Sequence, residues 1–305
     1  MLLRERDLSG RVSLPAFYAR RARRLGPALL LFLGTMGLLS VTPLSVAPSG
    51  HDLVGALTGV GNYSVALKGH DTVITHTWSL SIEQQFYLLW PALLVVALWL
   101  ARGRLTVLAT VTAVAVAFSV LQRFLLWDGG AGALRVYVGS DTRMDALLIG
   151  CLAGLWLHGR TPGVDHPRIA VAAIGVICVL GLTTGAVALL VVPTLVPWLG
   201  VAGILALVRQ EGAGWLARPA IRLVGERSYG LFLWHYPLFG VAVALPGRVV
   251  VPALVVAALL AFGMAHLSWH CVEMPFMRGR HRPSGDGDSV ARGVPRRRGT
   301  VRLGA

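Results

Sequence analysis

Charged residues are scarce in this sequence. They make up only 14% of its 305 residues, whereas a soluble domain usually carries about a quarter. Hydrophobic residues reach 55%, and the mean hydropathy is +0.67. The apolar residues come in blocks of about twenty, the length of a helix that spans a bilayer, and they do not alternate with polar residues as a membrane β-barrel requires. We therefore predict an all-α, polytopic membrane protein.

Cysteine is also rare, with three residues in the chain. Cys151, Cys178 and Cys271 lie in or beside apolar segments, and their spacing matches no metal-binding pattern. We therefore expect three buried, inert cysteines, and neither a metal nor a bound cofactor.

Eight segments are long and apolar enough to be predicted as transmembrane helices: 25–46, 79–100, 105–126, 143–158, 169–187, 190–208, 229–246 and 249–271. Another apolar segment, 52–67, is shorter and contains several glycines. We interpret it as an interfacial or re-entrant piece. Residues 1–277 are thus predicted to form one transmembrane domain.

Acidic residues are outnumbered two to one, with 14 Asp and Glu against 28 Lys and Arg. If residues 1–24 are cytoplasmic, 23 basic residues fall in cytoplasmic segments and 3 in external ones. This asymmetry follows the positive-inside rule, predicts that both termini are cytoplasmic, and argues against nucleic-acid binding. Residues 278–305 are rich in Arg, Pro, Gly and Ser, which predicts a disordered basic tail attracted to anionic membrane lipids.

The first polar motif, FYARRARRLGP at residues 17–27, stands directly before a predicted span. Arg20 and Arg24 are four residues apart and share one helix face, whereas Arg21 falls on another. The motif is consistent either with a positive-inside anchor or with a cytoplasmic site for a phosphate-rich donor, because guanidinium groups bind phosphate in a bidentate manner.

The second motif, HTWSLSIEQQFYLLWP at residues 76–91, opens an apolar helix. The spacing of Glu83, Tyr87 and Trp90 places them in one stripe. An interfacial aromatic belt explains the aromatic residues. It explains Glu83 less well, because a carboxylate one turn inside the membrane is too short to reach the interface.

The third motif, SDTRMDALLIG at residues 140–150, contains polar residues at the start of the predicted span 143–158. Asp141 or Thr142 is a candidate N-cap, and Asp145 is a favourable acid in the first turn. Arg143 opposes the helix dipole at this end, so we expect it to have an acidic partner.

Four ionisable groups are predicted at the same membrane depth, near the external ends of their spans: Glu83, Arg123, Arg143 and Asp145. Charged groups inside a membrane mark functional sites. We hypothesise a shared polar site, with Glu83 and Arg143 paired in an acceptor pocket that is open to the outside.

Two motifs remain near the C-terminus. In GERSYGLFLWHYPLF, residues 225–239, Ser228 is a candidate N-cap. His235 lies about 10 Å into that span, where both a packing role and a chemical role are open. WHCVEMPF, residues 269–276, ends the last span, and Glu273 there is a candidate ion-pair partner for a nearby arginine.

These five motifs, in this order, resemble the integral-membrane acyltransferase-3 family. Its members have ten spans and O-acylate exported carbohydrates and related acceptors. The resemblance covers residues 1–277, and its most specific element is the signature Trp-Ser-Leu-Ser-x-Glu-x-Gln-Phe-Tyr.

The resemblance implies that an acyl-coenzyme A, with acetyl as the expected acyl group, is bound from the cytoplasm by Arg20, Arg21 and Arg24. The other positions that match family motifs are Trp78, Ser79, Glu83, Phe86, Tyr87, Arg143, Asp145, Ser228, Tyr229 and His235. We expect an acceptor site or a structural polar cluster built from Trp78, Ser79, Glu83, Tyr87, Arg123, Arg143 and Asp145.

One departure from the family concerns the N-terminus. Family members begin with two further spans, and a His in the first of them is the expected catalytic base. This sequence starts just after the point where the second of these spans should end, which indicates a misassigned start or a truncated protein. For a truncated form we expect little or no activity, with His235 as a weak candidate for the base.

We therefore predict a membrane-bound O-acyltransferase of a bacterial plasma membrane. Its acceptor would be a carbohydrate, a glycolipid or a secondary metabolite. Two alternatives stay open: an inactive remnant or partner subunit, and a transporter or flippase, for which repeat symmetry and broken helices are expected.

Overall fold

The computed structural model describes residues 2–41, 47–69, 71–129, 132–160, 167–207 and 218–278. Every regular element in these ranges is helical, which confirms the all-α prediction. The α-helices are α1 (Leu2–Ser9), α2 (Leu14–Leu39), α3 (Gly50–Thr58), α4 (Gly61–Lys68), α5 (Trp78–Leu100), α6 (Leu105–Leu125), α7 (Ala133–Val138), α8 (Ser140–Arg143), α9 (Asp145–Leu157), α10 (Pro167–Leu180), α11 (Val192–Leu207), α12 (Pro219–Glu226), α13 (Ser228–Val243), α14 (Val250–Ser268) and α15 (Met274–Arg278). The short 3-10 and π turns are η1 (Thr75–Thr77), η2 (Val187–Val191), η3 (Gly247–Val249) and η4 (Trp269–Glu273).

Each predicted span overlaps one of these helices, although the bounds differ, and residues 42–46 and 208 of the predicted spans lie outside the described residues. In chain order these helices are α2, α5, α6, α9, α10, α11, α13 and α14. Among the described residues, 4 continuous helices are long and apolar enough to cross a membrane: Thr75–Leu100, Leu105–Leu125, Val187–Leu207 and Gly247–Met277. α9 and α10 are shorter apolar helices. The chain is thus a polytopic helical membrane protein.

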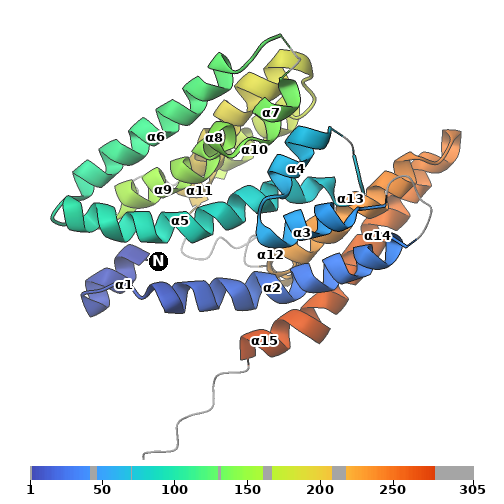
Figure 1. Ribbon diagram of the computed structural model, residues 1–305, viewed down its shortest axis with the longest axis horizontal. Helices are drawn as coiled ribbons and strands as arrows, with labels where there is room; N and C mark the ends of the chain where they lie inside the picture. Colours follow the sequence, from blue (N-terminus) through green and yellow to red (C-terminus); the bar gives the residue numbers. More distant parts are fainter. Residues whose placement is uncertain are drawn as a thin grey trace, which may run out of the picture.

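The long helices form two groups that meet along α2 and α5 (Figure 1). In the first group, α5 leads into α6, α6 packs on α9, and α11 packs on both α9 and α10. In the second group, α13 and α14 form a closely packed hairpin, and α2 contacts both α13 and the end of α14 through η4. Because α2 touches both groups, its polar residues are available to a site between them.

The segment predicted not to span, 52–67, forms the short helices α3 and α4. A capping box opens α3, in which the side chains of Ser49 and Asp52 each bond the other's backbone N–H. Gly59 ends the helix with a φ of 77°, and a Cβ there would lie 2.8 Å from the Gln84 side-chain oxygen. Glycine is therefore needed at this turn both for its backbone conformation and for the close approach of α5.

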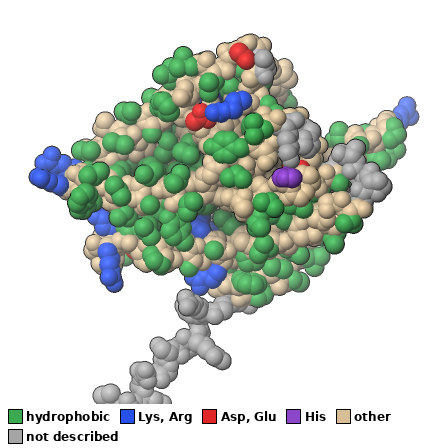
Figure 2. Space-filling model, viewed as in Figure 1, with side chains coloured by type: hydrophobic (Ala, Val, Ile, Leu, Met, Phe, Trp, Pro, Cys, Tyr) green, Lys and Arg blue, Asp and Glu red, His purple; other side chains and the backbone are tan. Residues whose placement is uncertain are grey.

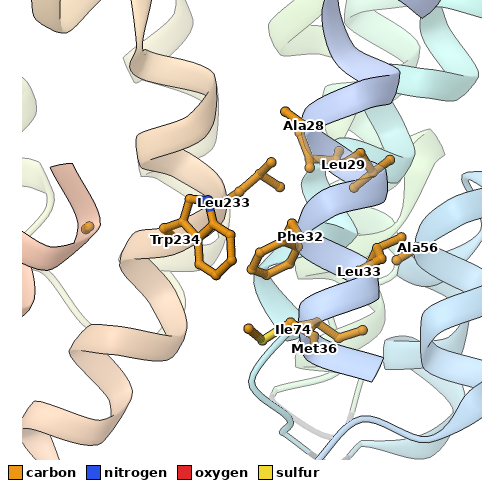
Figure 3. Close-up of a cluster of buried hydrophobic side chains, with 11 residues drawn as sticks. Ala28, Leu29, Phe32, Leu33, Met36, Ala56, Ile74, Leu233 and Trp234 are labelled. Atoms are coloured by element: carbon orange, nitrogen blue, oxygen red, sulfur yellow. The ribbon is translucent and has the colours of Figure 1, made fainter. Parts of the chain in front are cut away.

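The largest apolar cluster joins α2 to α13 (Figure 3). Phe32 is fully buried and meets Trp234 edge to face, with 5.3 Å between the ring centroids. Ala56 lies across α2 from Trp234, and Ile74 lies next to Met36 in the same cluster (Figure 3). This packing fixes α13 beside α2 and so sets the distance between their polar residues.

Small residues allow α13 and α14 to pack closely. A Cβ at Gly230 would lie 3.0 Å from the Ala265 Cβ and 3.1 Å from its Cα. Helices in a membrane commonly use such small-residue contacts, because lipid offers no hydrophobic driving force for their association.

The outer surface is apolar, as expected in lipid. On the face shown in Figure 2, hydrophobic side chains cover the middle, and Lys and Arg gather toward the edges. Two of the three cysteines, Cys178 and Cys271, are exposed on this kind of surface, and Cys151 is half-buried. The prediction of three buried cysteines is therefore wrong, because an apolar residue in a membrane protein can face lipid as readily as protein.

Candidate functional site

Four parts of the chain surround a cavity of about 460 Å³: α2, α5, the α8–α9 junction and α13. We call it the motif cavity, because its polar and aromatic lining comes from the four longer sequence motifs: Arg21, Arg24, Trp78, Ser79, Glu83, Tyr87, Arg143, Ser228 and Tyr229. These motifs lie far apart in the sequence. The basic motif and the Glu83 motif, predicted to serve separate cytoplasmic and external sites, thus share one cavity.

The helix α2 presents two arginines to the motif cavity. Arg21 and Arg24 both line it. The Arg21 guanidinium lies 4.5 Å from the centre of the Tyr87 ring, and its Nη1 lies 3.4 Å from the Tyr87 hydroxyl. Arg20, which shares a helix face with Arg24 by spacing alone, is instead paired with Glu5 on α1 at 3.2 Å. Arg20 is therefore outside the cavity lining, and Arg21 is part of it.

Glu83 lies in the second turn of α5. Its Oε1 accepts a hydrogen bond of 2.5 Å from the hydroxyl of Tyr87, one turn further along. Arg143 lines the same cavity, but among the described side chains no ion pair joins it to Glu83. The hypothesised Glu83–Arg143 pair is therefore wrong as a direct contact, although both groups face one space.

Arg143 is held by aromatic rings in place of a carboxylate. Its guanidinium carbon lies 5.5 Å from the centre of the Trp78 ring and 5.1 Å from that of Tyr137. Within the described part of the chain, its Nη1 is buried and has no hydrogen-bond partner. Buried donors are nearly always paired. Arg143 also lines the motif cavity, so it adds a positive charge to the cavity wall.

Arg123 and Asp145 form a separate buried ion pair. Arg123 Nη2 lies 2.6 Å from Asp145 Oδ1, and the two side chains are 0% and 1% exposed. Arg123 also donates to the Thr142 carbonyl at 2.6 and 3.0 Å and to the Thr194 hydroxyl at 2.6 Å. The pair ties α6 to α9 and α11. The four ionisable groups therefore divide into two that line the motif cavity and two that hold helices together.

A second cavity, of about 470 Å³, adjoins the first. We call it the histidine cavity, because His76 and His235 line it with Asp71, Tyr137 and Tyr236. It shares three wall residues with the motif cavity: Trp78, Ser79 and Phe232. His235 thus lies next to the motif cavity without lining it, and its Nδ1 is 2.7 Å from the Phe232 carbonyl oxygen. From the sequence alone, neither His76 nor Asp71 was predicted to be a site residue.

Two of the predicted helix caps are wrong. Asp141 forms a two-bond ion pair with Arg135, at 2.8 Å for each bond, and α8 has no side-chain cap. The guanidinium of Arg135 lowers the pKa of Asp141, and Asp141 raises that of Arg135. Thr142 donates to the carbonyls of Val136 and Gly139. Ser228 likewise makes no cap at α13, since Arg227 occupies that position without a side-chain bond.

Glu273, the candidate partner for an arginine at the end of the last span, is buried in the π-helical turn η4. Its carboxylate accepts a hydrogen bond of 3.1 Å from Ser268. In the described chain, no arginine lies within ion-pairing distance of it. The predicted ion pair is therefore not formed.

A family model described as an acyltransferase domain matches residues 2–269, which is most of the chain. The chain belongs to the acyltransferase-3 family. A "Putative O-acetyltransferase" of Staphylococcus aureus (strain COL) is 28% identical over 91% of this chain and 50% of its own length. "O-acetyltransferase OatA" of Staphylococcus aureus (strain NCTC 8325 / PS 47) is 25% identical over the same shares. The chain thus spans about half the length of the curated relatives it matches, and no solved structure is significantly similar to it.

A polar network missed by the motif analysis supports the acyltransferase-3 signature helix α5. Gln85 donates to the Gly59 carbonyl at 2.7 Å and to Asn62 at 3.0 Å, and it accepts from Ser140 at 2.5 Å. Asn62 is fully buried and also donates to Ser140 at 3.0 Å. The sequence signal for this network was one amide side chain in each of two apolar segments, Asn62 in 52–67 and Gln85 in 79–100. This network fixes the rotation of α5, and with it the direction of Glu83.

Proposed function

We propose that this protein is a membrane-bound O-acyltransferase that moves an acyl group from cytoplasmic acyl-coenzyme A to a hydroxyl of a carbohydrate or related acceptor. The observation that carries the proposal is the shared cavity, which brings Arg21 and Arg24 together with Glu83 and Arg143. Groups suited to binding phosphate and groups suited to acyl transfer thus line one space. The names of the two S. aureus relatives favour acetyl as the acyl group.

The arginines of α2 suit the donor. Coenzyme A carries several phosphates, and guanidinium groups bind phosphate through two parallel hydrogen bonds. The start of α2 is joined to two other segments that are predicted to be cytoplasmic. Arg20 of α2 pairs with Glu5 of α1 at 3.2 Å, and Asp7 of α1 contacts His158 at the end of α9 at 3.1 Å. This supports entry of the donor from the cytoplasmic side of a bacterial plasma membrane.

The remaining polar groups suit the reaction. The acceptor hydroxyl oxygen attacks the thioester carbonyl carbon, so that a C–O bond forms and the C–S bond breaks. The Glu83 carboxylate takes the hydroxyl proton and passes it to the departing sulfur. The positive charge of Arg143, which lines the cavity, stabilises the carbonyl oxygen as negative charge develops on it. Each role uses a group that lines the motif cavity.

The test is transfer of radiolabelled acetyl from acetyl-coenzyme A to a hydroxylated acceptor by the purified chain in lipid vesicles. Arg24→Gln should raise the KM for acetyl-coenzyme A about tenfold, because a charge-assisted bond to phosphate is lost. Arg23→Gln is the matched control, since Arg23 bonds the Ala19 carbonyl at 2.9 Å and is not part of the cavity lining. Absence of transfer by the wild type would overturn the proposal in favour of an inactive remnant or partner subunit, and equal KM values for the two variants would count against donor binding by Arg24. Uptake of labelled solute without transfer would instead favour a transporter.

A further inference from the structure

The histidine cavity has features of a binding site that the donor does not use. It is bounded by the end of α4, residues 71–76, α7 and α13. In the predicted topology the first three of these are external. Trp78, Ser79 and Phe232 line both this cavity and the motif cavity, so the two spaces adjoin at these residues. A molecule bound in it would therefore lie beside the acyl group and on the side away from the coenzyme.

One buried side chain packs the wall of this cavity. His76 is only 7% exposed, and its two ring nitrogens are buried near the backbone carbonyls of Leu233 and Phe232. Its ring stacks on Tyr236, with centroids 4.7 Å apart, and meets the Phe32 ring at 5.8 Å. His76 therefore holds Tyr236 in place, and Tyr236 in turn positions the polar group at the cavity, Asp71.

The other lining groups define the class of ligand. Asp71 is exposed at the cavity, and its two oxygens are held by the Tyr236 hydroxyl at 2.8 and 3.0 Å. The rings of Trp78 and Tyr137 lie 5.0 Å apart and present apolar faces. A carboxylate beside aromatic faces fits a ring that carries hydroxyls on its edge and C–H groups on its face.

Charge argues for a neutral ligand. The Arg143 guanidinium already lies over both aromatic rings, at 5.5 and 5.1 Å. A positive charge there opposes binding of a second cation to these rings. The Asp71 carboxylate in turn disfavours an anion. A neutral, hydroxylated ring satisfies both constraints.

We infer that the histidine cavity is the acceptor site, and that it binds a neutral sugar ring, with Asp71 hydrogen-bonding its hydroxyls and Trp78 and Tyr137 packing on its face. This inference rests on the proposed acyl transfer. It goes beyond that proposal because it places the acceptor in the adjoining cavity, where Asp71 and Tyr137 lie outside the motif cavity.

The experiment measures binding and turnover separately. Binding of chitotetraose, a neutral sugar oligomer, to the full chain in lipid nanodiscs is followed by saturation-transfer NMR, which needs no catalysis. Asp71→Asn is the main variant, because Asp71 is exposed and its replacement keeps the side chain's size. We expect it to weaken sugar binding about tenfold, as for the loss of a charge-assisted hydrogen bond. Tyr137→Ala should weaken it similarly, whereas the control Tyr63→Phe, outside the cavity lining, should not.

The turnover arm compares KM values for the two substrates. Asp71→Asn should raise the KM for the sugar and leave that for acetyl-coenzyme A within twofold. The inference is overturned if the wild type does not bind chitotetraose, or if Asp71→Asn and Tyr137→Ala bind it as the wild type does. If sugar binding behaves as expected but no acetyl is transferred, the site stands as a sugar site and the proposed transferase function fails.

Discussion

Asp145 matches a family motif, and its buried ion pair with Arg123 allows us to test whether its role is structural or catalytic. We consider Asp145→Asn, which keeps the shape of the side chain but removes its charge. Arg123 would then remain fully buried with only neutral partners, the Thr142 carbonyl and the Thr194 hydroxyl. Breaking a buried pair by neutralising one partner costs about 3–5 kcal/mol.

The magnitude can be bracketed with a second variant. Thr194→Val removes the 2.6 Å hydrogen bond to Arg123 Nη1 but leaves the ion pair intact. A hydrogen bond to a charged group contributes about 1.5–3 kcal/mol. Because the two changes share Arg123, the double variant should lose less stability than the sum of the two single losses.

The assay is unfolding of the purified protein by SDS in mixed micelles, followed by circular dichroism. We expect the free energy of unfolding to fall in the order wild type, Thr194→Val, Asp145→Asn. Acyl transfer by the Asp145→Asn protein that stays folded should be close to normal, since Asp145 is absent from the motif cavity lining. The reasoning is refuted if Asp145→Asn changes stability by less than about 1 kcal/mol and yet abolishes transfer, because the residue would then act in the chemistry.

Three further outcomes are expected. Glu83→Gln should reduce acyl transfer by about 10²–10⁴-fold while acetyl-coenzyme A still binds; transfer near the wild-type rate would exclude Glu83 as the proton acceptor. Gly230→Ala should lower the free energy of unfolding by about 1–3 kcal/mol through overpacking, whereas Gly240→Ala, with nothing within 4 Å of its Cβ position, should not lower it; equal effects would contradict the close approach of α13 and α14. The Arg135 pair lowers the pKa of Asp141 in the folded state, so its stabilisation is present above the ordinary carboxyl pKa and is lost as the pH falls through the lowered value. Asp141→Asn should therefore be less stable than the wild type at neutral pH and equal to it in strong acid, and a difference that persists in acid would show that the ion pair is not its cause.

The sequence alone determined the fold class and the positions of the helices. Apolar block length is a local property, since a helix in lipid must satisfy its own backbone hydrogen bonds and needs about twenty residues to span the bilayer. For the same reason 52–67, which is too short, was correctly set apart. The five motifs also carried the family, which the match over residues 2–269 confirmed.

Only the tertiary structure decided which polar residues meet. By spacing alone, Arg20 and Arg24 are expected to share a site. In the structure Arg20 instead pairs with Glu5 of α1, and Arg21 lines the cavity together with Arg24. Arg123 and Arg143 are predicted at the same membrane depth, which suggested a shared site. In the structure Arg123 is paired with Asp145 in the protein interior, whereas Arg143 lines the cavity. Partners of this kind come from helices distant in the sequence, and their rotation about the helix axis depends on packing. A chain with apolar residues on every side of its helices contains no local signal for that rotation, because lipid accepts the same residues as the protein core.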